Sequence, residues 1–306
     1  MRWQIRCLRD NVKSILPFQD QLRLMKRRVC GYRPGSDHGA WTLTQGVEMV
    51  RSLREYIDLP NSTVLEVGTG WQPLIPLLFS MAGTKQVILT DLTRLLHPSS
   101  LAAALDSLRY NKKRITEGLP ISSEAFDQFT RSNQGETLEQ SLERFRLRYM
   151  APCDCRSTGL PPNSVDAVIS RAVMEHIPPD VILAIFHESA RIIKPGGVAC
   201  HVVDNSDHWQ HRDGNISRVN FLKFSDSTFR LTYINKLNYQ NRLRHSQYRE
   251  MLEQAGFQIV RDEPTVDAPS VEVLKNFQVA PQFRRFTHED LATIDSFFLA
   301  RRPAAN

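Results

Sequence analysis

Short runs of apolar and β-branched residues recur along the chain, with longer amphipathic stretches between them. The clearest run is Thr63–Val67, and similar runs follow at Gln86–Thr90 and at residues 165–170, 198–203 and 257–260. Runs that are this short and apolar on both faces are typical of strands buried inside a sheet. The first run leads through a tight turn into a helix start, which is the arrangement of an α/β protein.

Apolar residues at helical spacing predict helices around these runs. The expected helices cover residues 5–29 with a break at Pro17, then 42–56, 101–110, 122–130, 138–149, 180–193 and 247–254. Thr44 is a candidate N-cap in the second helix, and Gly256 closes the last one.

The segment between Asp91 and Asp154 is much longer than one connecting helix requires. We interpret residues 95–148 as a helical insertion. An insertion at the carboxyl edge of the strands can cover a substrate, and a peripheral or oligomer-forming bundle is the alternative.

The turn after the first run reads E-V-G-T-G-W-Q-P from Glu66 to Pro73. Glycines allow the backbone to pass close beneath a ligand, and proline suits the first position of a helix. A dinucleotide-binding fingerprint would carry a third glycine where Pro73 stands. In addition, the carboxylate of Glu66 suits a cationic ligand better than a phosphate. Asp91 lies about 20 residues further on, at the offset of an acid that binds ribose hydroxyls.

A set of motifs follows in a fixed order: E-V-G-T-G, L-T-D, C-D-C, L-P-P-N-S-V-D-A-V-I-S, A-V-M-E-H-I and K-P-G-G. This set resembles the class I S-adenosylmethionine-dependent methyltransferases, specifically over about residues 60–204 and more loosely elsewhere. The resemblance implies a doubly wound, seven-stranded Rossmann-like α/β sheet, with S-F-F-L-A-R-R-P as an antiparallel strand between the fifth and sixth. It implies an N-terminal helical lid at residues 1–60 and a methyltransferase domain at residues 61–306, and the lid candidates are Tyr32, Trp41 and Gln45.

The same resemblance implies a set of residues that bind S-adenosyl-L-methionine. Gly68 and Gly70 would lie against the methionine part, with Glu66 near its ammonium group. The remaining assignments are Asp91 and Leu92 at the ribose, Asp154 and Cys155 at the adenine, and Ser170 and Arg171 beside the sulfonium and carboxylate. The family usually has another glycine where Gln72 stands, so the loop differs slightly here.

Candidates for acid–base chemistry and for substrate contact follow the fourth and fifth strands. His176, His208 and Asp204 are the candidate catalytic residues, and structural roles are the alternative. The candidate substrate contacts are Glu175, Tyr233, Asn235, Tyr239, Asn241 and Arg242, for which packing and surface loops are the alternative. The histidines and aspartates of residues 201–211 are ordinary metal ligands, but their spacing fits no specific site, so no metal is predicted.

The composition and net charge of the chain limit the expected partners and cellular location of the protein. The 306 residues are 41% hydrophobic and 24% charged, which is typical of a globular protein with a sizeable core. The net charge of +6 includes two basic clusters on predicted helices, but no recognisable nucleic-acid module accompanies them, so we expect no nucleic-acid partner. Five cysteines without a C-x-x-C pair, and no membrane-length apolar run, indicate a cytoplasmic protein without membrane contact. A homodimer is left open.

The hypothesis from the sequence is methyl transfer to a small-molecule acceptor in specialised metabolism. The amine-methylating signature N/D-P-P-Y/F is absent, because residues 170–173 read S-R-A-V. One alternative is intramolecular cyclisation of S-adenosylmethionine to azetidine-2-carboxylate with release of methylthioadenosine. A cofactor-binding partner subunit without catalysis is another.

Overall fold

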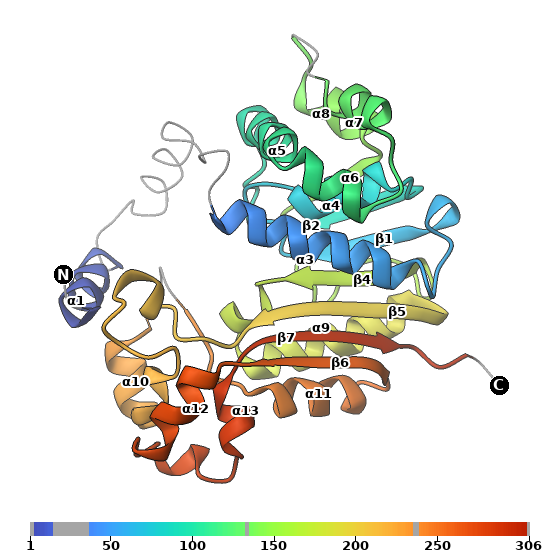
Figure 1. The fold of residues 1–306 in the computed structure, drawn as a ribbon. Helices are drawn as coiled ribbons and strands as arrows, with labels where there is room; N and C mark the ends of the chain where they lie inside the picture. The colour runs from blue at the N-terminus through green and yellow to red at the C-terminus, as the bar shows by residue number, and fades with distance from the viewer. Residues whose placement is uncertain (1–2, 15–36, 132–134, 235–238, 305–306) are drawn as a thin grey trace.

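The computed structural model describes residues 3–14, 37–131, 135–234 and 239–304. Its centre is a seven-stranded sheet with the strand order β3-β2-β1-β4-β5-β7-β6 (Figure 1). The strands are β1 (Thr63–Val67), β2 (Gln86–Thr90), β3 (Leu147–Met150), β4 (Val165–Arg171), β5 (Ile193–Asp204), β6 (Gln258–Val266) and β7 (Thr293–Arg301). All neighbouring strands pair in parallel, except that β7 is antiparallel to both β5 and β6. The doubly wound Rossmann-like sheet predicted from the sequence is therefore confirmed.

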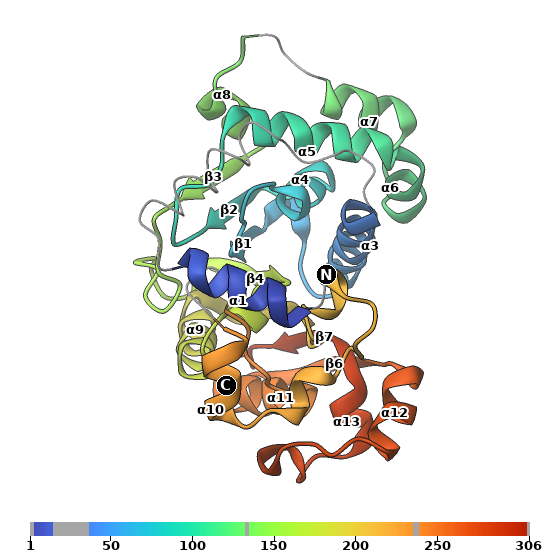
Figure 2. The same cartoon turned by 90° about the vertical axis from the view of Figure 1, so that its left-hand side faces the viewer.

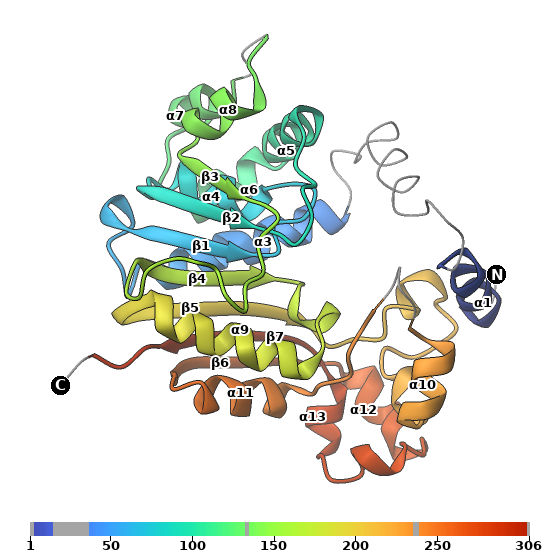
Figure 3. The same cartoon turned by 180° about the vertical axis from the view of Figure 1, so that it is seen from behind.

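Helices cover both faces of this sheet, because its strands are apolar on both faces. On one face, Val64 and Val87 pack against α3 (Asp37–Leu53) and α4 (Leu74–Met81). On the other face, Leu65 and Val168 pack against α9 (Pro179–Ile192) and α11 (His245–Gln254), which Figure 3 shows in front. The carboxyl ends of the parallel strands consequently meet at one edge, where ligands bind in open α/β sheets.

The predicted insertion consists of four helices above β3 and β2 in Figure 1. They are α5 (Pro98–Tyr110), α6 (Lys112–Gly118), α7 (Ser123–Thr130) and α8 (Leu138–Arg144). The helix expected at residues 138–149 is too long, because Arg146 takes a positive φ of 55° and Leu147–Met150 pairs with β2. The insertion shares the hydrophobic core of α3 and α4 and so forms part of the same packed body.

A second, smaller hydrophobic core lies beyond the carboxyl ends of β4 and β5. We call it the cover cluster, and it gathers segments that are far apart in the sequence. Its elements are α1 (Trp3–Ser14), η3 (Gln210–Arg212), η4 (Asn220–Lys223), α10 (Asp226–Thr232), α12 (Ala268–Lys275), η5 (Pro281–Phe283) and α13 (His288–Ala292). Figures 1 and 2 both place α1 beside α10. The N-terminal helices therefore divide, with α1 in the cover cluster and α3 on the sheet.

Two local expectations differ from the structure near the N-terminus. Thr44 is not an N-cap, because α3 begins at Asp37 and the Thr44 hydroxyl donates to the Ala40 carbonyl at 3.0 Å inside the helix. The second half of the helix expected at residues 5–29, and the lid candidate Tyr32, lie outside the described residues. Among the described helices, none combines the length and hydropathy of a membrane span.

Candidate functional site

The turn between β1 and α4 is held in an unusual conformation by two glycines. Gly68 and Gly70 have φ angles of +73° and +67°, a region that side chains with a Cβ disfavour. A Cβ on Gly68 would also lie 2.7 Å from Val173 Cγ1. The amides of Gly68 and Thr69 donate to the Thr90 carbonyl at 3.0 Å, so the bend is fastened to the end of β2.

Glu66 precedes this bend and contributes a buried carboxylate to the cavity described below. It is 5% exposed, and its Oε2 atom has no hydrogen-bond partner among the described residues. Burial, together with the nearby charge of Asp91, raises the pKa of Glu66 to about 8. An orphaned carboxylate of this kind fits a ligand that brings a cation, such as an ammonium group.

The next strand end carries Asp91, whose carboxylate is aligned by the backbone. Its Oδ2 accepts from the Gly70 amide and its Oδ1 from the Thr93 amide, both at 3.0 Å. Burial raises the pKa of Asp91 despite these bonds. Because two amides fix the plane of the carboxylate, its remaining lone pairs can face a pair of hydroxyl groups.

The loop after β3 lies next to Asp91, because the Cys153 amide donates to the Asp91 carbonyl at 2.8 Å. Cys155 is buried and contacts the Thr90 hydroxyl at 3.0 Å. The Asp154 carboxylate pairs with Arg156 at 2.6 Å, which lowers the Asp154 pKa. Leu92 is 71% exposed. Leu92 and Asp154 therefore form an accessible rim beside the buried Cys155, and neither these residues nor Asp91 line the cavity described below.

A cavity of about 850 Å³ connects the glycine bend to the ends of β4 and β5. Its lining includes predicted residues from both ends of the site, namely Glu66, Gly68, Gly70, Arg171, Glu175, His176, Asp204 and His208. Trp41 and Gln45 of α3 also line it, as the lid candidates require. Most of the predicted cofactor and catalytic residues therefore share one space.

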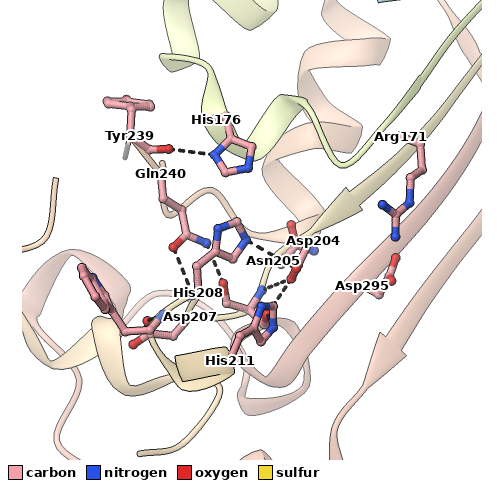
Figure 4. Close-up of polar contacts among 12 residues, drawn as sticks. Arg171, His176, Asp204, Asn205, Asp207, His208, His211, Tyr239, Gln240 and Asp295 are labelled. Carbon is pink, nitrogen blue, oxygen red and sulfur yellow. Dashed lines mark hydrogen bonds and ion pairs between the residues drawn. The ribbon is translucent and has the colours of Figure 1, made fainter. Parts of the chain in front are cut away.

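Asp204 at the end of β5 is the centre of a polar cluster at one end of the cavity (Figure 4). Its Oδ1 accepts from the Ser206 amide at 2.9 Å and from the Ser206 hydroxyl at 2.6 Å, and its Oδ2 lies 3.4 Å from His208 Nε2. Burial alone would raise the pKa of Asp204, but His208 and Ser206 stabilise the charged form and bring the pKa below its usual range. Asp204 therefore stays ionised near neutral pH.

His176 reaches the same cluster from the turn η2 (Met174–His176), which follows β4. Its Nδ1 atom lies 2.8 Å from the Tyr239 carbonyl oxygen. Burial and the nearby His208 lower the pKa of His176, so its ring is neutral at pH 7. Because a carbonyl only accepts, Nδ1 carries the proton and Nε2 keeps a lone pair.

Asp295 of β7 is a cavity residue that the sequence did not indicate. It sits opposite Asp204 in the β5–β7 register, and Figure 4 shows it facing Arg171. Gln45 bridges the two, because its Nε2 donates to Asp295 Oδ2 at 2.8 Å and its Oε1 accepts from Arg171 Nε at 2.7 Å. Burial and the charge of Asp204 raise the pKa of Asp295 to about 7. Only the strand register reveals this pairing, which no local motif encodes.

A sequence model of the methyltransferase domain matches residues 44–262, which is most of the chain. The chain belongs to the methyltransferase domain family. Its cofactor is S-adenosyl-L-methionine. No curated protein matches the sequence.

Solved structures similar to this methyltransferase share low sequence identity with it. A methyltransferase of Haloferax volcanii, in complex with the Trm112 activator, is similar over 94% of this chain and 98% of that chain, with 15% identity and a TM-score of 0.48. An S-adenosylmethionine-dependent methyltransferase of Listeria monocytogenes is similar over 84% of this chain and 98% of that chain, with 15% identity and a TM-score of 0.45. The cyclase SpnF is similar over 85% of this chain and 82% of that chain, with 15% identity and a TM-score of 0.46.

Several residues predicted from the sequence lie away from the cavity of the methyltransferase. Ser170 is fully buried and its hydroxyl hydrogen-bonds to His201 Nδ1 at 2.8 Å, because alternate residues of β4 face opposite sides of the sheet. Tyr233 belongs to the cover cluster, where its hydroxyl accepts from Asn220 at 2.7 Å and donates to Asp207 at 3.1 Å. Neither side chain lines the cavity.

Three further substrate candidates instead support the walls of the cavity. The Arg242 guanidinium donates to the Phe221 carbonyl at 2.9 Å and pairs with Asp226 at 2.6 Å. Asn241 binds the backbone of the η2 turn, and Tyr239 contributes its carbonyl to His176. Asn235 lies outside the described residues. The Asn- and aromatic-rich stretch thus holds neighbouring backbone in place, and none of its described candidates lines the cavity.

Proposed function

We propose that this methyltransferase transfers the methyl group of S-adenosyl-L-methionine to a small-molecule acceptor at the Asp204 end of the cavity. The observation that carries the proposal is the single cavity of about 850 Å³, with Glu66 and the glycine bend at one end and His176, Asp204 and His208 at the other. Cavities for small ligands usually measure about 300–1,000 Å³, so this space can hold a cofactor and a small acceptor together.

The glycine end suits the amino-acid part of the cofactor. The carboxylate of Glu66, whose Oε2 has no hydrogen-bond partner among the described residues, would pair with its ammonium group, and the backbone at Gly70 leaves room for a ligand above the bend. Asp91, fixed by two amides, is placed for the ribose hydroxyls. The adenine would then lie over the accessible rim beside Cys155.

When bound, the cofactor supplies an activated methyl group on a sulfonium, which is already a good leaving group. The chain therefore contributes mainly alignment of the acceptor and exclusion of water. His176 can in addition accept a proton from the acceptor at its free Nε2 atom, because its Nδ1 is committed to the Tyr239 carbonyl.

Ion pairs within the basic cluster at residues 109–114 favour a small acceptor over a nucleic acid. Arg109 pairs with Asp106 at 2.6 Å and Lys112 with Asp127 at 2.7 Å. These ion pairs lie on the insertion helices α5, α6 and α7, whereas the catalytic candidates face an interior cavity. The charge of the cluster is thus partly balanced by neighbouring acids.

The test is incubation of the purified protein with methyl-labelled S-adenosylmethionine and fractions of a metabolite extract. Mass spectrometry should find S-adenosylhomocysteine together with a labelled small molecule. Glu66→Gln should weaken binding of S-adenosylhomocysteine by tenfold or more, since it removes one charge-assisted contact, and the exposed Glu117→Gln is the control. Methylthioadenosine from the cofactor alone would instead indicate cyclisation and contradict the proposal.

A further inference from the structure

Glu175, His176 and His208 converge at the acceptor end of the cavity. A carboxylate oxygen of Glu175 and one ring nitrogen of each histidine lie within 4.8 Å of one another. All three side chains line the cavity, so the space between them is open to an entering ion or substrate.

Glu175 carries a buried carboxylate, and the charge of Arg171 partly stabilises its ionised form. It is 2% exposed, and neither of its oxygens has a hydrogen-bond partner among the described residues. Burial and the charge of Asp204 raise the pKa of Glu175 well above its usual range. A buried carboxylate of this kind is costly unless a cation completes its surroundings.

Each of the two imidazoles brings a ring nitrogen close to the Glu175 carboxylate. His176 has Nε2 available, because the Tyr239 carbonyl fixes the proton on Nδ1. This carbonyl–imidazole contact is the outer-sphere arrangement that orients metal-binding histidines. The ring of His208 lies 5.0 Å from that of His176 between centroids, and its Nε2 lies 3.4 Å from Asp204 Oδ2.

One short segment, residues 239–241, holds both loops that carry these side chains. Asn241 donates to the carbonyls of Met174 and Ile177, both at 2.8 Å, on either side of Glu175 and His176. Gln240 donates to the Ser206 carbonyl at 2.6 Å and accepts from the His208 amide at 3.3 Å. The three donor groups are therefore positioned before any ligand binds, as a binding site requires.

We propose that Glu175, His176 and His208 bind one divalent transition-metal ion. Two imidazoles and one carboxylate suit ions such as Zn²⁺, Mn²⁺, Fe²⁺ or Co²⁺, whereas Ca²⁺ and Mg²⁺ prefer oxygen ligands alone. The set leaves coordination positions open toward the cavity. Sequence spacing predicts no metal here, because the ligands come from the ends of two different strands and only the fold brings them together.

The role of the ion follows from the proposed function and rests on it. An acceptor oxygen bound to the ion in the cavity would lose its proton more easily, since a divalent cation stabilises the anion. The acceptor class is then a molecule with an oxygen donor, such as a hydroxyl or carboxylate, next to the methylated atom.

The test measures metal binding without measuring catalysis. Chelator-treated full-length protein is titrated with Co²⁺, followed by visible absorption and calorimetry, and Zn²⁺ is then added as a competitor. We expect one Co²⁺ per chain, displaced by Zn²⁺. Glu175→Gln and His208→Ala should each weaken binding by more than about tenfold, because each removes a direct ligand and even outer-shell changes cost about 10–100-fold. His187→Ala, which removes an exposed histidine on α9, is the matched control and should bind as the unmodified protein does.

Circular dichroism separates loss of metal binding from loss of folding, and Glu175→Gln keeps the shape of the side chain. The proposal is overturned if Co²⁺ does not bind, or if it binds equally to Glu175→Gln and His208→Ala. Stabilisation of the fold by a small primary amine but not by Co²⁺ would also overturn it and assign the pocket to a cationic substrate. None of these results affects the test of methyl transfer, which is read from S-adenosylhomocysteine.

Discussion

Gly68 and Gly70 have nearly the same backbone conformation but different surroundings. A Cβ on Gly68 would lie 2.7 Å from Val173 Cγ1, whereas a Cβ on Gly70 would meet no atom within 4 Å. Gly68 thus combines a positive φ with close packing against the turn that leads to Glu175 and His176. The first glycine is a structural requirement, and the second mainly leaves space for the cofactor.

We predict that Gly68→Ala lowers the free energy of unfolding by about 2–4 kcal/mol, from backbone strain and overpacking together. Gly70→Ala should cost about 1–2 kcal/mol, from backbone strain alone. Urea denaturation of the cofactor-free protein measures both. In the double variant Gly68→Ala/Val173→Ala the steric part should be relieved, relative to Val173→Ala. Equal effects of the two single variants would contradict this account.

The positions of the expected cofactor-binding residues relative to the sheet could be predicted, because these residues lie within a few positions of a strand end. Glu66, Gly68 and Asp91 follow directly from short local patterns. Ser170 and Arg171 show the limit, because adjacent residues of a strand face opposite sides and the motif does not tell which one faces the ligand. Asp295 required the β5–β7 register, which is a long-range property.

At the scale of elements, prediction failed where local pattern and tertiary pairing disagree. Residues 145–149 continue the apolar spacing of α8, yet β2 offers an unpaired edge and Leu147–Met150 completes it as β3. The cover cluster is a second example. Its core joins α1 to residues more than 200 positions later, such as Trp209, and no periodicity within one helix reveals such a partner.

Trp3 connects α1 to the cover cluster. Its ring centroid lies 4.7 Å from that of Tyr233 and 5.9 Å from that of Phe224, and the side chain is 8% exposed. Trp3→Ala should remove packing that contributes about 3–5 kcal/mol to stability and should release α1 from the cover cluster. Hydrogen–deuterium exchange should then show the amides of α1 exchanging faster. Leu8→Ala, at a residue that is 66% exposed on the same helix, is the control. Unchanged exchange in Trp3→Ala would show that other contacts hold α1.

At the scale of the whole molecule, the sheet order was predictable because the motifs fix the order and direction of the central strands. The site was less predictable, because its walls come from α3, the glycine bend and the ends of β4, β5 and β7. One consequence is a concentration of buried acids beneath one cavity. Burial raises the pKa of Glu66 to about 8 and that of Asp295 to about 7.

These acids predict that the cofactor-free protein loses stability as the pH rises from about 4 to about 8, with the loss levelling off above the folded-state pKa values. In the unfolded chain both carboxyl groups lose their protons near pH 4, but in the folded protein they keep them up to about pH 7–8. The folded state thus binds more protons, and the free energy of unfolding should fall by about 1–2 kcal/mol per pH unit around pH 7. His201, whose pKa burial lowers to about 3, has the opposite effect only below about pH 6.5.

Urea denaturation of the chelator-treated protein at intervals between pH 6.5 and 8 measures this slope. Glu66→Gln should reduce it, because the amide does not titrate, while Glu117→Gln should leave it unchanged. Saturating S-adenosylhomocysteine should also flatten it, since its ammonium group would stabilise the ionised form of Glu66. A stability that rises with pH in this range would mean that the cofactor-free protein already stabilises the ionised forms of Glu66 and Asp295. The same slope in Glu66→Gln as in the unmodified protein would place its origin elsewhere in the molecule.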